Sequence, residues 1–593
     1  MKRKQKYDVV LFALLATLSF MPLLQQYLNM FKINPLNGKT VVVEKPKLNF
    51  ETYTSGVFSS VAEAYVGGNF GFREPIIRLY NQYLWDFYGK TYANDVVGGK
   101  QGWLFYPQHV SDYYGTELLR WQPSVEEAKQ NLDREVKYLN WARTILKDNG
   151  VELLVFMAPE KGQLYPEYLP EVERDTTTFN ACDYVADCFD ETGFPYIEMT
   201  RWFKQMKDSV PYLLIPQTGG HWNFSSVIAA DSLFRYMGEL KGMDLPNISI
   251  GELHPSDKSA IDAETDLEQL LNLAWPIRKR TALAPEAEVR IVSSPSATKL
   301  KVLFVGNSFF WRISHYIPLE EMFDEVEFWY YFSTAYYGRG FSQTTPVANY
   351  NLLEKLLDFD YVVWFATGNQ LCKGTSGFAD QSIVALTVSD SLMIAHAIPI
   401  VDSLRNDTAL TKAFDTLSPS ERDEALYWRA TQAIKRQPTL IPQLRGDSLT
   451  IRNEEIPYAK IAKDIKKDSI WMAALEAQAF LRGATMKMML YAEAEHIMHG
   501  KPLYKNQTAE IQFSIRCQEE VRQLAGQIPD NLEFMEFLKK NAETQGKTME
   551  RTIEDAAEWL IREQYGLHGC SFIDDSEAEI PLPADFPSPI TNK

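Results

Sequence analysis

The chain has 593 residues, of which 45% are apolar and 23% are charged. This composition is typical of a globular protein long enough to form two or more domains, and it excludes a chain that is disordered throughout. The net charge of −18 is not offset by any Lys/Arg-rich stripe. Binding to DNA or RNA is therefore not expected, because a polyanion would be repelled.

The N-terminus combines a basic flank with an apolar segment. Four basic residues stand in the first eight positions, and the run Val9–Leu24 that follows is almost entirely apolar. A spanning helix needs about 17–25 mainly apolar residues, a length that this segment reaches if it continues to Phe31. We predict an uncleaved membrane anchor over residues 1–35, with the remaining chain on the periplasmic, extracytoplasmic side. A cleaved signal peptide and a buried core helix are the alternatives.

The pattern of a globular α/β domain covers residues 36–400. Helices are predicted over Glu74–Tyr88 and Ser124–Asn149, with a glycine-punctuated strand and turn between them. Short apolar runs then alternate with helical segments at Val151–Met157, Lys301–Val305, Val326–Phe332 and Tyr361–Phe365. This alternation predicts a mostly parallel sheet with helices on both faces. Ser382–Val401 is predicted to be one amphipathic or buried helix.

The strand signals stop after about residue 400. Helices are predicted over Asp415–Gln437, Ala459–Gly483 and Gln507–Gly526, in a helical domain spanning 401–573. A weak internal repeat indicates two stacked helical hairpins. Its first copy, Trp471, Leu475, Ala479, Gly483, Thr485, Met486, Ala494 and Ile497, recurs as Phe534, Leu538, Ala542, Gly546, Thr548, Met549, Ala557 and Leu560. The acidic, Pro-rich tail 574–593 is predicted to be unstructured.

The cysteines predict neither a metal site nor a disulfide framework. They form no CxxC pair and have no His partner at zinc spacing, so no cofactor is expected. Cys182 and Cys188 fall on different faces of a predicted helix, which favours free thiols. The five cysteines are Cys182, Cys188, Cys372, Cys517 and Cys570.

One serine stands where a nucleophile would be reactive. The apolar strand Lys301–Val305 ends in Gly306-Asn307-Ser308, and a helical pattern follows from Trp311 to Phe323. The carboxyl end of a parallel strand faces the ligand crevice, and a backbone N–H at a helix start can stabilise an oxyanion. The alternative is a serine that only caps the helix.

One histidine stands in a glycine-flanked loop. His221 follows Gly219-Gly220 and precedes Trp222, and a helix is predicted over Ser225–Leu240. An accessible imidazole suits a general base. The alternative is a loop histidine that is hydrogen-bonded to the backbone.

The two signals together resemble the alginate O-acetyltransferase family (AlgX/AlgJ-like), over roughly residues 70–370. The resemblance rests on four motifs and on their order, with the His-Trp motif before the serine motif. The motifs are Gly98–Tyr106, Ala158–Gly162 with Tyr165–Pro170, His221-Trp222, and Gly306-Asn307-Ser308. The resemblance implies a permuted SGNH-hydrolase-like fold of three layers, α/β/α.

The resemblance also implies roles for individual residues. Ser308 would be the nucleophile and His221 the base, and Asn307 would replace the family's usual Asp in the serine motif. From their strand-end position, we add Asn369 and Gly368 as candidates for oxyanion stabilisation or positioning; the alternative is a turn, which Gly-Asn pairs often form.

The sequence departs from the family at one important position. The family places an Asp two residues before the His, and here that position is Gly219. A backbone carbonyl can orient His221, or a distant Asp or Glu can fill the space. In the third case the site binds glycan without catalysis.

A set of aromatic and basic residues is expected to line a carbohydrate groove. The aromatic segment 328–331 can instead be a buried strand, whereas Tyr336 and Tyr337 are predicted in a loop. The candidates are Trp222, Lys161, Tyr336, Tyr337 and Arg339.

Three functions follow from these observations. The first is transfer of an acetyl group through Ser308 to a cell-surface or exported polysaccharide, with a multipass membrane O-acyltransferase as the acyl donor, as the resemblance implies. The second is an SGNH-type esterase, which differs in using water as acceptor. The third is an inactive glycan-binding or scaffold protein of an envelope assembly.

Overall fold

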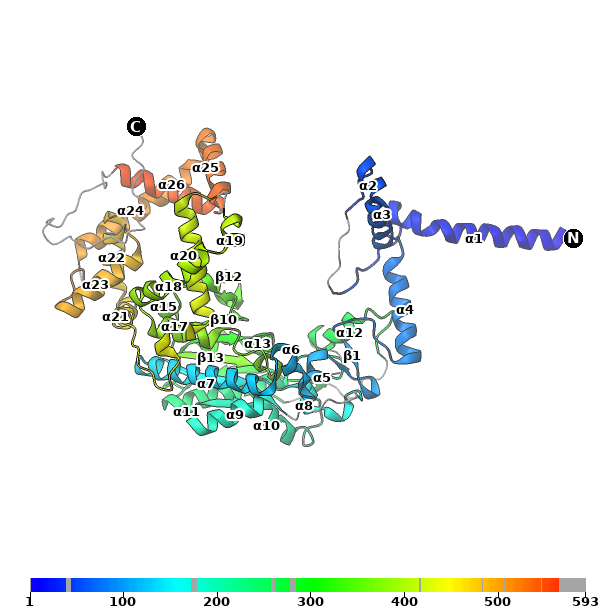
Figure 1. Cartoon of the computed structure of the whole chain (residues 1–593), viewed down its shortest axis with the longest axis horizontal. Helices are drawn as coiled ribbons and strands as arrows, with labels where there is room; N and C mark the ends of the chain where they lie inside the picture. Colours follow the sequence, from blue (N-terminus) through cyan, green and yellow to red (C-terminus); the bar gives the residue numbers. More distant parts are fainter. Residues whose placement is uncertain are drawn as a thin grey trace. The chain divides into compact units, whose positions relative to one another are not determined.

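The computed structural model describes residues 2–38, 44–171, 179–252, 254–256, 262–277, 284–414, 417–482, 484–505, 507–545 and 547–564 (Figure 1). The chain divides into two compact units. The first comprises residues up to 147, 151–350 and 359–381, and the second comprises 148–150, 351–358 and the chain from 382 onward. The second unit thus begins before the predicted boundary near residue 400. The predicted unstructured tail lies outside the described residues.

A seven-stranded sheet forms the centre of the first unit, in the order β12-β11-β10-β9-β13-β3-β4. The strands from β10 to β4 are parallel, and β11 and β12 extend one edge as antiparallel strands. The predicted mostly parallel sheet is confirmed. Its strands are β3 (Glu152–Met157), β4 (Tyr196–Glu198), β9 (Lys301–Gly306), β10 (Glu325–Tyr330), β11 (Thr334–Tyr337), β12 (Gln343–Pro346) and β13 (Tyr361–Ala366).

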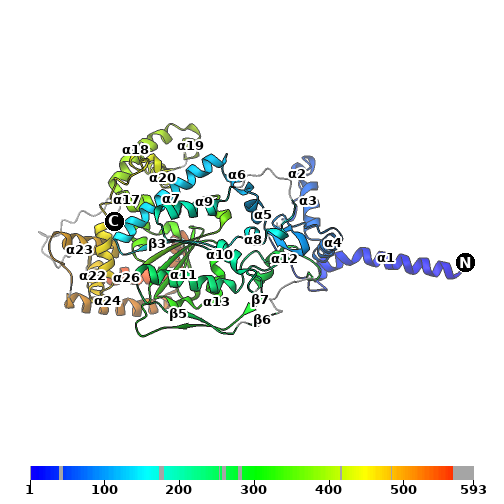
Figure 2. The same cartoon turned by 90° about the horizontal axis from the view of Figure 1, so that it is seen from below.

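Helices cover both faces of this sheet, as predicted (Figure 2). Every residue of β3 and β13 is buried, which explains why these strands read as continuous apolar runs instead of alternating patterns. On one face, apolar side chains of β3, β9 and β13 form a common core with two of the helices. These are α11 (Ser225–Lys241) and α13 (Phe310–Tyr316), and the opposite face carries α7 (Val125–Asp148) and α9 (Ala181–Thr192).

Two shorter features of the first unit lead towards the site. The predicted strand and turn form a hairpin of β1 (Val97–Gly98) and β2 (Leu104–Phe105). A short helix, α12 (Asp266–Leu270), follows the 3₁₀ turn Asp262–Thr265. No helix was predicted there, although Leu267, Leu270 and Leu271 stand at helical spacing.

Two predicted single helices are broken in the structure. The predicted helix 311–323 consists of α13 and α14 (Leu319–Met322). Pro318 separates them because proline cannot donate to a helix and restricts the residue before it. Likewise, 382–401 is not one helix but the end of α17 (Phe378–Thr387) and most of α18 (Asp390–Arg405). Ser389 caps α18 by accepting from the Leu392 N–H.

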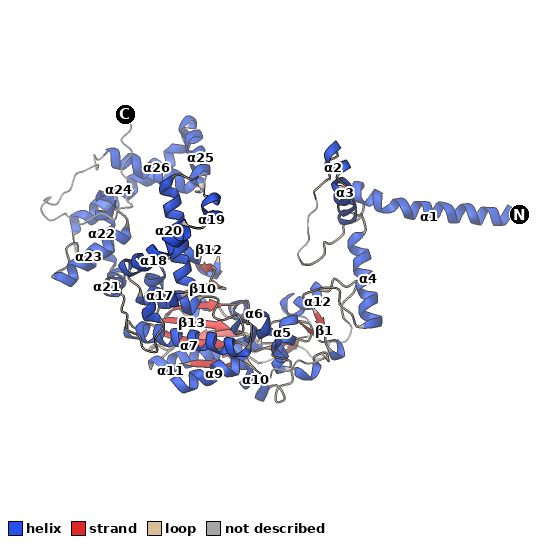
Figure 3. Cartoon of the chain, viewed as in Figure 1, coloured by secondary structure: helices blue, strands red, loops and turns tan. Residues whose placement is uncertain are grey.

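Every regular element of the second unit that the structure describes is a helix (Figure 3). The predicted helix 459–483 is also two helices, because Asp468 caps the second. The predicted repeat lies on α22 (Ser469–Arg482) and α23 (Met486–His499) and again on α25 (Leu532–Gln545) and α26 (Met549–Gln564), and the helices α21 (Ile456–Lys466) and α24 (Thr508–Gln527) precede the two hairpins.

The two copies of the repeat have the same helix caps. Oδ1 of Asp468 and of Asn531 each accepts a hydrogen bond of 3.1 Å from the backbone N–H three residues later. The hydroxyls of Thr485 and Thr548 accept equivalent bonds of 3.3 and 3.2 Å. Each pair is separated by 63 positions (531 minus 468, and 548 minus 485). Both copies therefore fold as helical hairpins with matching starts.

The N-terminal segment forms the helix α1 (Lys2–Leu28). Its part Val9–Leu28 is long and apolar enough to cross a membrane, and its side chains are largely exposed. In a water-soluble protein an exposed apolar surface of this length would be unfavourable.

Candidate active site

Ser308 lies just past the carboxyl end of β9, between two parallel neighbours of the sheet. Gly306 is required there, because a Cβ on it would come within 2.0 Å of the Phe365 backbone oxygen in β13. The chain then turns into α13, and this turn presents the Ser308 hydroxyl at the carboxyl edge of the sheet.

His221 contacts both Ser308 and an acidic residue. Its Nε2 lies 2.8 Å from the Ser308 Oγ, and its Nδ1 lies 2.7 Å from Oδ2 of Asp266. His221 and Ser308 are separated by 87 positions, and His221 and Asp266 by 45. Both distances are hydrogen-bond distances, and the three side chains are arranged like a Ser-His-Asp triad.

Asp266 supplies the carboxylate that this sequence lacks at Gly219, where the family has an Asp. Its Oδ1 accepts hydrogen bonds from the backbone N–H of Gly220 and Leu267, at 2.7 and 2.8 Å. Burial opposes ionisation of this carboxyl, but its hydrogen bond and charge interaction with His221 outweigh burial and hold its pKa below the usual value. Of the three outcomes left open by Gly219, the second is the one observed.

The loop that carries His221 is fastened by Lys161. Its ammonium is fully buried and donates to the backbone oxygens of Leu104, Gln217 and Gly219, at 2.7, 2.9 and 2.6 Å. Burial lowers the pKa of Lys161 well below its usual value. Lys161 was predicted to line a carbohydrate groove. Instead it joins the β1–β2 hairpin to the histidine loop, since three carbonyl oxygens compensate the buried charge.

Trp222 is also structural in this arrangement. It is fully buried, and its indole N–H donates to the backbone oxygen of Phe309 at 2.9 Å. The bond ties the residue after His221 to the residue after Ser308. The expectation that Trp222 lines a groove is therefore not met, and its position explains instead why the two loops keep their register.

A cavity of about 360 Å³ opens at Ser308 and His221. Tyr331 is one of its walls and adopts a left-handed backbone, with φ of 49°, while its N–H donates to the Gly306 oxygen at 2.7 Å. Such a conformation is costly for a non-glycine residue and occurs mainly where the surroundings enforce it. Further lining residues are Tyr106, Gln108, His109, Thr367, Lys373 and Ser376.

The asparagines at the strand ends have different positions. Asn307 is buried; its Oδ1 accepts from the Phe309 N–H, and its Nδ2 donates to Thr367 and Gln370. Asn369 lines the cavity, and its Oδ1 accepts from the Thr367 hydroxyl at 3.0 Å. The Nδ2 of Asn369 has no hydrogen-bond partner within the described chain, so it is oriented by Thr367 and can donate to a ligand.

Gly368 stands at the start of α16 (Gly368–Leu371), directly against two buried carboxyls. A Cβ on Gly368 would lie 3.2 Å from the side chains of both Asp112 and Glu160. Burial raises the pKa of Asp112 to about 7 and that of Glu160 well above its usual value. Glu160 accepts from the Asn369 N–H at 3.0 Å, so this acidic pair supports the strand end behind the cavity.

His109 is the second histidine of the cavity and lies 4.0 Å from Glu160, measured between Nε2 and Oε2. It is buried, and burial together with the nearby Lys161 charge lowers its pKa to about 3. A neutral imidazole therefore faces the site beside the His221 base.

The remaining groove candidates do not line the cavity. Tyr336 and Tyr337 belong to β11 and not to a loop, and Tyr336 packs edge-on against Trp311 at 4.9 Å between ring centroids. Arg339 is exposed and lies 3.9 Å from Glu320. The difference arises because the residues predicted to form a loop instead form β11, which pairs with β12 as an antiparallel hairpin at the edge of the sheet.

Sequence reasoning missed Asp266, Tyr106 and His109 as members of the site. Asp266 is one of several acidic residues in its segment, and nothing in their spacing distinguishes it. Tyr106 was part of a quoted motif, but only the fold places its ring over Gly220, where a Cβ would come within 2.2 Å of the ring.

The chain is similar to one family model and to several solved structures. No curated protein matches the sequence. Solved structures similar to the chain include the O-acetyltransferase domain of Pseudomonas putida AlgJ, at 15% identity over 47% of this chain and 92% of that one, with a TM-score of 0.30. Pseudomonas aeruginosa AlgX matches at 15% identity over 50% of this chain and 67% of that one, with a TM-score of 0.30. Bacillus cereus PatB1 matches at 12% identity over 47% of this chain and 98% of that one, with a TM-score of 0.28.

The match to a family model is the more specific finding. Residues 96–312 match the model described as an SGNH hydrolase-like domain, acetyltransferase AlgX. This range includes Ser308, His221 and Asp266. The resemblance to the AlgX-like acetyltransferases that the sequence motifs indicated is thus confirmed for residues 96–312.

Proposed function

We propose that this protein is an extracytoplasmic O-acetyltransferase that moves an acetyl group through Ser308 to a hydroxyl of a polysaccharide. The observation that carries the proposal is the hydrogen-bonded series Ser308, His221 and Asp266. The presence of Asp266 argues against the inactive scaffold, because a protein that only binds glycan has no need of a carboxylate behind the histidine.

In the first half of the reaction, His221 Nε2 takes the Ser308 hydroxyl proton while Oγ attacks the carbonyl carbon of the acyl donor. The resulting oxyanion would be stabilised by the Ser308 backbone N–H and the Nδ2 of Asn369. The tetrahedral intermediate then expels the donor's leaving group, which takes the proton from His221. Ser308 is left as an acetyl ester.

In the second half, the neutral His221 removes a proton from the acceptor hydroxyl, and the acceptor oxygen attacks the acetyl ester. Collapse of the intermediate breaks the bond to Oγ, and His221 returns the proton to Ser308. Asp266 stabilises the imidazolium in both halves, and in the neutral His221 it keeps the proton on Nδ1 so that Nε2 can act as the base. The buried Lys161 holds the loop that carries His221 by donating to the backbone oxygens of Gln217 and Gly219.

The location rests on α1, whose apolar part Val9–Leu28 follows a basic flank. Such a helix would anchor the chain with its N-terminus inside. The resemblance to the AlgX-like acetyltransferases implies a multipass acyltransferase as the donor, and an enzyme anchored beside it would meet the acyl group at a raised local concentration.

The first experiment measures acetate release from 4-nitrophenyl acetate by the full chain in detergent. Ser308→Ala is expected to reduce the rate to the uncatalysed background, since no other group forms the ester. Ser314→Ala, six residues further along the chain and within α13, is the matched control and should retain the rate. Unchanged activity of Ser308→Ala would overturn the proposal.

Transfer and hydrolysis share the same residues, so the acceptor distinguishes them. Oligosaccharides with free hydroxyls are added during turnover, and the sugar is examined by mass spectrometry. A transferase yields sugars heavier by one acetyl group, whereas an esterase releases acetate only and leaves the sugar mass unchanged.

A further inference from the structure

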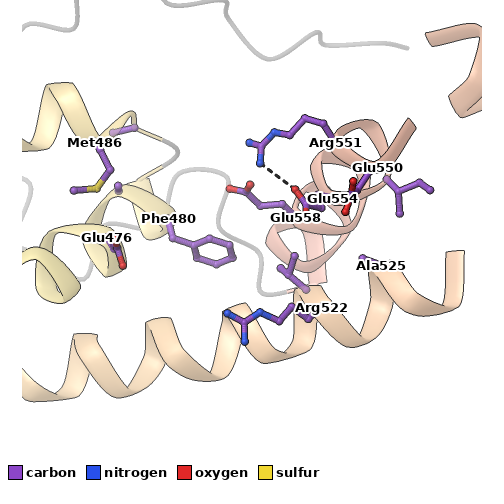
Figure 4. Close-up of a pocket in the computed structure, with 13 residues that line it drawn as sticks. Glu476, Phe480, Met486, Arg522, Ala525, Glu550, Arg551, Glu554 and Glu558 are labelled. Carbon is purple, nitrogen blue, oxygen red and sulfur yellow. Dashed lines mark hydrogen bonds and ion pairs between the residues drawn. The ribbon is translucent and has the colours of Figure 1, made fainter. Parts of the chain in front are cut away.

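A groove of about 970 Å³ lies in the second unit and takes no part in the Ser308 chemistry. Its floor is α24, which packs against both α22 and α26. The start of α23 closes one end. Figure 4 shows the two walls, with Phe480 pointing from α22 into the space toward α26.

The groove follows the seam between the two copies of the repeat. Apolar residues of α22 and α23 pack into one core, and those of α24, α25 and α26 pack into another. Side chains at the edge of each core line the groove. The apolar part of the lining consists of Ala479, Phe480, Ala484, Met486, Val521, Ala525 and Ile553.

The small and flexible side chains in the lining favour a helix as the occupant of the groove. Ala479, Ala484 and Ala525 leave the lining helices accessible to close approach, since the distance between packed helices depends on the side chains at the contact. Met486 can adjust to different partners. Three helices with an open apolar seam present the geometry in which a further helix inserts its apolar face.

The rim of the groove is acidic. Its described lining contains Glu476, Glu550, Glu554 and Glu558 against Arg522 and Arg551, a net charge of −2 (four negative and two positive). Arg551 is already engaged within α26 by Glu554 and Asp555, at 3.2 and 3.1 Å. Glu476 stands on the wall formed by α22, and Glu550 stands on the wall formed by α26.

We propose that this groove binds an amphipathic, positively charged helix of a partner protein. The apolar face of that helix would contact Phe480, Met486 and Ile553, with anchors at positions i, i+3, i+4 and i+7. Lys or Arg side chains on its flanks would meet Glu476 on one wall and Glu550 on the other. The unit would then serve as the docking module that brings a partner to the enzyme.

The test uses a designed helical peptide as the probe. A fluorescein-labelled peptide carries Leu at i, i+3, i+4 and i+7 with Lys on both flanks, and a second peptide has Glu in place of Lys. Anisotropy is measured with the full chain in phosphatidylcholine nanodiscs, with empty nanodiscs as background. The Lys peptide is expected to bind at least about tenfold more tightly than the Glu peptide.

Charge reversal inside the groove gives the decisive comparison. Glu476→Lys with Glu550→Lys should weaken the Lys peptide about tenfold and favour the Glu peptide. Reversal of two exposed glutamates outside the groove, Glu519→Lys with Glu536→Lys, should change the Kd by less than about twofold. Because charge changes can disturb folding, Ala525→Trp is a second variant. It fills the floor without altering charge and should also abolish binding, with circular dichroism verifying the helices.

Three outcomes would overturn the proposal. They are the absence of saturable binding of the Lys peptide, equal binding of both peptides, and an unchanged Kd in both groove variants. If the chain instead forms dimers that the groove variants dissociate, the occupant is a second copy of the chain and not a cationic partner.

Discussion

The Ser308 site and the helical repeat are built from contacts of very different range. Ser308, His221 and Asp266 meet across separations of 87 and 45 positions. In the repeat, each helix start is defined by a bond between residues only three positions apart, such as Thr485 and Met488. Function in the first unit therefore depends on the relative placement of loops, whereas the second unit depends on locally defined helices that stack.

This difference predicts where a single substitution is severe. A residue that connects two loops of the site has no substitute, because its partners are fixed by the sheet and by buried carbonyls. A cap in the repeat is one of several similar contributions. We therefore expect large losses of rate or stability in the first unit and small ones in the second.

The largest effect is expected for Asp266→Asn. The amide keeps the size of the side chain but cannot stabilise the imidazolium, so kcat should fall by roughly 10⁴-fold with little change in fold. Stopped assays of 4-nitrophenyl acetate turnover measure this loss. Asp208→Asn, at an exposed turn, should retain full activity. A loss below about tenfold would mean that another group replaces Asp266.

Lys161→Met should impair both stability and rate. The substitution keeps much of the volume but leaves three backbone oxygens without their buried donor, a cost of roughly 3 kcal/mol. The thermal midpoint of the first unit should fall by roughly 5 °C. Lys147→Met, at the exposed end of α7, is the control. If both variants melt at the wild-type temperature, the three bonds do not hold the histidine loop.

Glu135→Gln is expected to change how stability depends on pH. Burial, with the nearby Asp380 charge, raises the pKa of Glu135 from 4.5 to about 7. The folded state therefore keeps a proton that the unfolded state releases above pH 4.5, and this group reduces stability as the pH rises from about 4.5 to 7. Melting between these pH values should show a shallower decline for the Gln variant. An equal slope would assign the decline to other carboxyls, such as Asp112.

The smallest effects are expected at the repeated caps. Thr485→Ala and Thr548→Ala each remove one bond to a helix N-terminus and should cost about 1 kcal/mol apiece. Urea titration followed by circular dichroism compares them. Thr431→Ala, inside α20 (Pro419–Arg436), lacks a capping role and should be neutral or slightly stabilising. Unequal costs at the two caps would show that the copies of the repeat are not equivalent.

Much of the fold could be predicted from local patterns. Continuous apolar runs predicted β3, β9, β10 and β13 to within one or two residues, because strands buried on both faces contain few polar residues. The β11–β12 hairpin was not predicted, since its strands are short and half exposed. The single helix expected over 311–323 is interrupted at Pro318, because proline lacks the N–H donor that a helix interior requires.

Two residues could be identified from their setting in the sequence, Ser308 after an apolar strand and His221 in a glycine loop. The apolar N-terminal helix and the repeat could also be identified in this way, because periodicity and caps are local properties. By contrast, the contact of Asp266 with His221 and the burial of Lys161 beneath the histidine loop became visible only in the folded chain. A hydrogen bond between loops depends on where the sheet places them, and no spacing along the chain encodes that distance.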